Sequence, residues 1–93
     1  MSVQKFPDPK DGGDDVDYTL DWSKVLPTGD TLATSTWLVP ADLTGHTDSF
    51  SDTETTIWIS GGVEGTSYTL TNTVTTVGGR TFERDVILKV KNL

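Results

Sequence analysis

Alternating apolar and polar positions predict short β-strands along most of the chain. Threonine occurs 17 times, and β-branched residues favour strands. No window repeats apolar residues at the 3.6-residue spacing of a helix for three turns. Turn signals rich in proline, glycine and aspartate separate the alternating stretches. The predicted strands span residues 17–23, 31–39, 46–50, 55–60, 66–76 and 80–91.

Six or seven strands in about 75 residues are typical of a small antiparallel immunoglobulin-like β-sandwich. We therefore expect an all-β domain over residues 17–93, preceded by an extended acidic N-terminal arm over residues 1–16. The arm has little apolar surface besides Val3 and Phe6. Burial within its own chain is not expected to offset the entropy of ordering it. It is either a flexible terminus or an arm that lies along a neighbouring subunit, with Phe6 as an anchor.

The last two predicted strands carry the most specific pattern. The apolar positions of one face are Tyr68, Leu70 and Val74 on the first strand and Phe82, Val86, Leu88 and Val90 on the second. A loop centred on Gly78 pairs Leu70 with Val86 and keeps both apolar sets on one face, because side chains alternate with period two. We expect a loop at residues 77–79 in which Gly78 or Gly79 has a positive φ angle. Leu70 then lies centrally in the core.

The same register places Asn72 opposite Arg84, where it is either at the periphery of the core face or part of a specific polar pair. Tyr68 follows Gly65 in a G-x-x-Y pattern. A tyrosine at this point of a Greek-key sandwich either bonds backward to the connecting loop, as a tyrosine corner, or is an ordinary core residue.

Three tryptophans, at positions 22, 37 and 58, are too many large rings for one small core. At least one is expected at the edge, where it caps the core or contacts a partner. Trp58 points away from its neighbours Ile57 and Ile59. Phe6, Trp22 and Trp58 are therefore the candidate partner-binding residues.

Charge argues against two classes of partner. Acids outnumber bases 14 to 7, and the net charge is -7. Residues 31–79 contain five acids and no lysine or arginine. Such a surface does not attract nucleic acid or an anionic membrane. No apolar run approaches the roughly 20 residues of a membrane span.

The sequence offers no catalytic, cofactor or metal site. The absence of cysteine excludes disulfides, zinc–cysteine sites and cysteine nucleophiles. Residues 11–17 hold four carboxylates, but their spacing does not fit a calcium loop. The acids of residues 48–54 and the single His46 lack the partners of an acid/base pair or a nucleophilic triad. We expect no enzyme and no cofactor.

Three motifs in order carry a family resemblance: D-Y-T-L-D-W-S at residues 17–23, S-T-W-L-V-P at 35–40 and W-I-S-G-G at 58–62. Together with residues 65–72, they resemble the fiber-tail adaptor proteins of tailed bacteriophages, over roughly residues 5–91. The resemblance implies an immunoglobulin-like, non-enzymatic protein of the virion tail. It implies protein–protein contacts with tail and fiber proteins and fits multiple copies in a symmetric ring.

Two other functions remain open at this point. A capsid or head-tail decoration protein would use the same kind of sandwich. A carbohydrate-binding module would use exposed aromatic rings such as Trp22 and Trp58 as a stacking platform. Fold alone does not choose among these functions.

Overall fold

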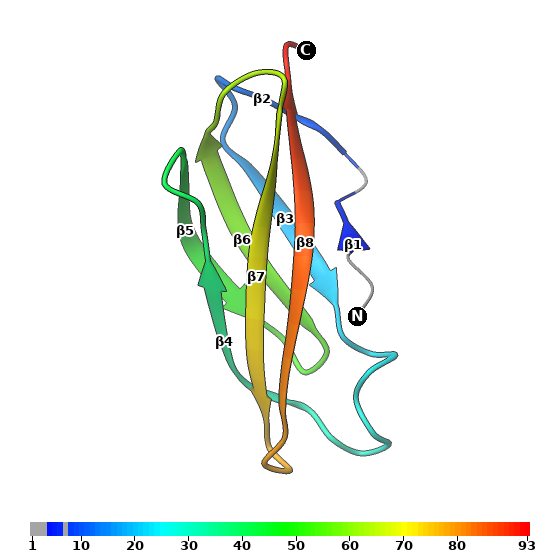
Figure 1. Ribbon diagram of the computed structural model, residues 1–93. Coiled ribbons are helices and arrows are strands. Elements are labelled where there is room, and N and C mark those ends of the chain that lie inside the picture. The colour runs from blue at the N-terminus through cyan, green and yellow to red at the C-terminus, as the bar shows by residue number, and fades with distance from the viewer. Residues whose placement is uncertain (1–3, 7) are drawn as a thin grey trace.

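Two β-sheets stack face to face in the computed structural model, which describes residues 4–6 and 8–93 (Figure 1). The strands are β1 (Gln4–Lys5), β2 (Lys10–Asp11), β3 (Val16–Asp21), β4 (Leu32–Leu38), β5 (Leu43–Phe50), β6 (Glu54–Gly61), β7 (Thr66–Thr76) and β8 (Thr81–Lys91). The larger sheet has the order β1-β8-β7-β4, and β2 also pairs with β8. The smaller sheet has the order β3-β6-β5. The all-β prediction is confirmed.

Strands β3 to β8 correspond to the six strands that the sequence predicts, and β7 has the predicted bounds of 66–76. The largest difference at the start of a strand is in β5, which begins at Leu43 rather than at His46. Gly45 weakens the strand pattern there, because glycine is disfavoured in strands.

The N-terminal arm forms the strands that the sequence does not predict. β1 and β2 run parallel to β8, so the larger sheet is mixed and the expectation of a purely antiparallel sandwich is wrong at this edge. The arm pairs with backbone groups of β8 that would otherwise form an open edge, and Phe6 N donates to Ile87 O at 3.0 Å. Residues 4–6 and 8–16 of the arm therefore pack against their own chain. Val3, named above as one of the arm's apolar residues, lies outside the described residues.

The predicted register of the β7–β8 hairpin is confirmed. Leu70 pairs with Val86, and Asn72 pairs with Arg84. Thr76 N donates to Arg80 O at 2.8 Å, which closes a three-residue loop at residues 77–79. The loop therefore has the odd length that the alternation requires.

The core lies between the sheets and is built from alternate strand positions. Leu70 and Leu88 of the larger sheet are completely buried and face Ile57 and Ile59 of the smaller sheet. A second cluster near the β7–β8 loop contains Leu20, Trp22, Leu32 and Val74. Both sheets therefore bury one face and leave the other free.

Strand β5 is interrupted by an irregular register between His46 and Ser49. Thr47 lies at this point with a φ of 50°, the left-handed region that non-glycine residues rarely adopt. A bulge of this kind bends the strand and breaks its ladder of hydrogen bonds. No helix of the described residues has the length and apolarity needed to cross a membrane.

Candidate functional site

Trp58 lies on the outer face of the smaller sheet, with 37% of its surface exposed. Alternation along β6 buries Ile57 and Ile59 on either side of it and turns its ring to solvent. The register places Asp17 of β3 and His46 of β5 directly opposite Trp58, one on each side. We call the outer face of the smaller sheet around this row of Asp17, Trp58 and His46 the Trp58 face.

His46 is held beside Trp58 by two hydrogen bonds. Its Nε2 lies within hydrogen-bond distance of Asp15 Oδ1, at 2.9 Å, and its Nδ1 lies 2.8 Å from the hydroxyl oxygen of Thr47. The His46 and Trp58 ring centroids lie 6.3 Å apart and the rings are tilted by 31°. The Trp58 face therefore has a positioned pair of rings at its centre.

Carboxylates lie on the same face as these rings, and no lysine or arginine occurs in the three strands of the smaller sheet. Asp21 lies directly opposite Glu54, a position in which like charges repel each other. Asp21 Oδ1 accepts a hydrogen bond from Ser23 N at 2.8 Å. This bond holds the pKa of Asp21 below its usual value, so the group is ionised at neutral pH. The Trp58 face is an acidic surface with an aromatic centre.

Trp22, the second candidate for partner binding, is 1% exposed and part of the core. Its Nε1 donates to Asn72 Oδ1 at 3.0 Å, and the guanidinium of Arg84 lies 5.7 Å from its ring centroid. In this position the ring of Trp22 packs in the core. The acceptor, Asn72, lies in the core, which the sequence did not predict.

Asn72 is completely buried and connects both sheets. Its Oδ1 also accepts from Thr55 Oγ1 at 2.7 Å, and its Nδ2 donates to Ser35 Oγ and to Thr36 O, each at 3.0 Å. The expectation that Asn72 lies at the periphery or forms a polar pair with Arg84 is therefore wrong, although the two residues are paired in the register. The amide of Asn72 can be buried without loss of hydrogen bonds because each of its polar groups has a partner.

Phe6, the third candidate, is 5% exposed and packs against Tyr18, with 4.7 Å between the ring centroids. Lys10, which the sequence did not single out, is 1% exposed. Its Nζ donates to Gly61 O and to Asp11 O, each at 2.7 Å. The aromatic ring and the ammonium group fasten the arm to the domain from two points.

The residues expected to have structural roles all belong to β7 or to the loop that follows it. Leu70 is fully buried in the core. The Tyr68 hydroxyl accepts from Val63 N at 2.8 Å, a bond back to the β6–β7 connection. Gly79 has a φ of 87°, and Gly78 N donates to Asp30 Oδ1 at 2.8 Å.

Two of the acidic residues considered as chemical candidates, Asp11 and Asp15, have structural contacts. Asp11 Oδ2 accepts from Gly13 N at 2.8 Å, and Asp15 is the partner of His46. In the part of the chain that the structure describes, no group of three or more His, Cys, Asp or Glu side chains is placed to hold a metal ion.

Exposed aromatic rings such as that of Trp58 are enriched at protein–protein interfaces. The chain belongs to the family described as podophage GP4 fiber-tail adaptor protein gp77, whose family model matches residues 10–89. No curated protein matches it. The chain is thus a non-enzymatic fiber-tail adaptor of the podophage virion tail, and the resemblance carried by residues 17–72 is confirmed.

Proposed function

We propose that this adaptor joins the tail to its fibers through protein–protein contacts in which the Trp58 face is a contact surface, with several copies arranged in a symmetric ring. The exposure of Trp58 between Asp17 and His46 is the observation that supports this surface. Aromatic residues are enriched at the centres of interfaces and often supply most of their binding energy. Phe6 and Trp22 are buried and serve the fold.

We also propose that the domain is immunoglobulin-like over residues 17–93, with residues 1–16 added to the edge of β8. Two packed sheets support this assignment, and so does the bond from Val63 N to the Tyr68 hydroxyl, because a tyrosine corner is a hallmark of such sandwiches. The arm then works as a support of the domain rather than as the surface that meets a partner.

Replacing Trp58 with alanine tests the contact surface. Trp58→Ala should leave the melting temperature nearly unchanged, because the ring is on the surface, and should reduce incorporation into virions by about tenfold or more. Quantitative immunoblots of purified particles measure the occupancy. Leu38→Ala is a matched control, since Leu38 is 71% exposed on the outer face of the larger sheet. Full occupancy of the Trp58→Ala variant would contradict the proposal.

The carbohydrate-binding alternative needs a platform of exposed rings. Trp22 is unable to supply one, because its ring is in the core and its Nε1 is bonded to Asn72. Trp58 therefore has no exposed Trp22 ring beside it to form such a platform, and no second function is proposed for this face.

A further inference from the structure

Three lysines gather on the outer face of the larger sheet, beside the C-terminal end of β8. Lys89 and Lys91 are two residues apart and therefore on the same face, about 7 Å from each other. Lys5 lies opposite Ile87, which has the same orientation as Lys89 and Lys91. All three lysines are exposed. We call Lys5, Lys89 and Lys91 the lysine patch.

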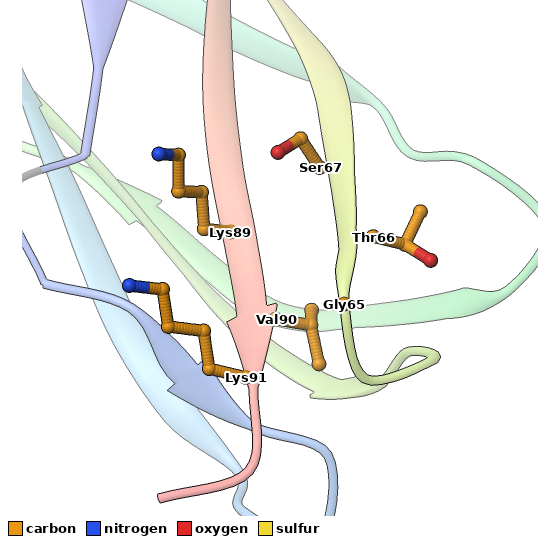
Figure 2. A pocket seen from close by; sticks show the side chains of 6 residues that line it. All are labelled: Gly65, Thr66, Ser67, Lys89, Val90 and Lys91. Atoms are coloured by element: carbon orange, nitrogen blue, oxygen red, sulfur yellow. The ribbon is translucent and has the colours of Figure 1, made fainter.

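The surface at the lysine patch is concave. Figure 2 shows the side chains of Lys89 and Lys91 leaving β8 in the same direction, beside a pocket that Gly65 and Ser67 also line. A second pocket of about 240 Å³ is lined by Lys5, Phe6, Pro9, Lys89 and Lys91. Within the described residues, none of the three lysines forms a salt bridge. The nearest acid in the register is Asp11, opposite Lys91, and its carboxylate accepts from Gly13 N and Leu93 N.

The Trp58 face has the complementary charge. The strands of the smaller sheet contain acids and no lysine or arginine, and Asp21 and Glu54 repel each other across a strand pair. A cationic partner would relieve this repulsion. An ammonium group over the indole of Trp58 would add a cation–π contact.

We propose that the lysine patch of one copy docks on the Trp58 face of the next copy. The inference rests on the proposed function, because it names the partner of that same face. The two surfaces lie on opposite sides of the stacked sheets, since each is on the outer face of its own sheet (Figure 1). Two copies are therefore unable to satisfy both contacts with each other. The contact is head-to-tail, and it closes a ring if the rotation between copies permits.

Charge reversal on each surface tests the contact with the purified protein. Sedimentation velocity is measured over a series of concentrations at low ionic strength for the wild type, for Lys89→Glu and for Asp17→Lys. The wild type should form oligomers, and each single variant should associate about tenfold more weakly, because like charges then meet at the interface. An equimolar mixture of the two variants should associate more strongly than either alone, because the reversed residues then attract each other. Oligomers should dissociate in about 1 M salt, where the Debye length is about 3 Å.

Lys24→Glu and Asp52→Lys are the matched controls, since they make the same charge changes in exposed connections outside the two surfaces. They should leave self-association unchanged. A monomeric wild type at all concentrations, or a mixture that associates no better than the separate variants, would overturn the proposal. If Trp58→Ala nevertheless fails to enter virions, the Trp58 face still contacts a virion protein, and only the choice of a second copy as its partner is wrong.

Discussion

Strand β8 has two neighbours that are held in different ways. On one side it pairs with β7 through ten consecutive register positions. On the other side the N-terminal arm contributes two pairs in β1 and two in β2. The hairpin is held by a continuous ladder and a shared apolar face. The arm has little ladder and depends on two buried anchors, the ring of Phe6 and the ammonium group of Lys10.

A segment with few strand pairs can thus be firmly attached through side chains. Phe6 fills a place in the core cluster that also contains Tyr18 and Leu88. Lys10 donates to the carbonyl of Gly61 at the end of β6, so it connects the arm to the smaller sheet. The arm therefore ties the two sheets together as well as extending one of them.

Removing the arm should have the largest effect on stability. Deletion of residues 1–11 should lower the free energy of unfolding by at least about 3–5 kcal/mol, the usual cost of losing a buried phenylalanine side chain. The deletion also opens the edge of β8 and removes the donor to Gly61 O. Urea denaturation followed by tryptophan fluorescence measures the loss. A change below about 1 kcal/mol would show that the arm does not contribute to the fold, and a flexible terminus would then describe it.

A single truncation in the hairpin should have a comparable or smaller effect. Leu70→Ala should cost about 2–5 kcal/mol, because Leu70 is completely buried between the sheets. The same denaturation experiment applies. Leu38→Ala should change stability by less than about 0.5 kcal/mol, since Leu38 is exposed. Equal effects of the two substitutions would mean that Leu70 is not in the core.

The smallest expected effect is on the pH dependence of stability. The hairpin loop is bonded to Asp30, and hydrogen bonds from Thr76, Gly78, Arg80 and Thr31 lower the pKa of this carboxylate. The arm contains Asp11, and hydrogen bonds from the backbone N–H groups of Gly13 and Leu93 lower its pKa. A lowered folded pKa means that the unfolded state binds more protons. Stability from these groups is therefore complete at neutral pH and lost as the pH falls through the acid range, from about pH 5 downward.

Asp11→Asn and Asp30→Asn should each make the loss of stability in acid less steep, because neither amide titrates. Urea midpoints at a series of pH values measure the slope. Asp52→Asn, in an exposed turn, is the matched control. A slope in either variant as steep as that of the wild type would show that the substituted carboxylate contributes nothing to acid unfolding.

The register of the hairpin was predictable from sequence because it depends on the pattern of residues close to the loop. The alternation on either side of Gly78 and Gly79 permits only some registers that keep both apolar sets on one face, and a loop centred on Gly78 gives the one in which Leu70 pairs with Val86. The outward direction of Trp58 followed from the same period of two.

The arm and the polar core were not predictable, since their stability comes from residues distant in the sequence. Lys10 can be buried because its ammonium group donates a hydrogen bond to Gly61 O, 51 residues away in the sequence. Asn72 is buried because Trp22, Thr55, Ser35 and Thr36 together satisfy its amide. No pattern of neighbouring residues shows that such partners converge, and composition alone describes both side chains as surface residues.

The left-handed Thr47 has a consequence for the protein at high concentration. Strand β5 is an outer strand of its sheet, and a long regular edge is a template on which further chains assemble into fibrils. The bulge at Thr47 divides this edge into two short pieces, so an incoming strand finds no continuous row of N–H and C=O groups. The bulge thereby protects the protein from amyloid-like growth along β5 and leaves the outer faces of its sheets unchanged.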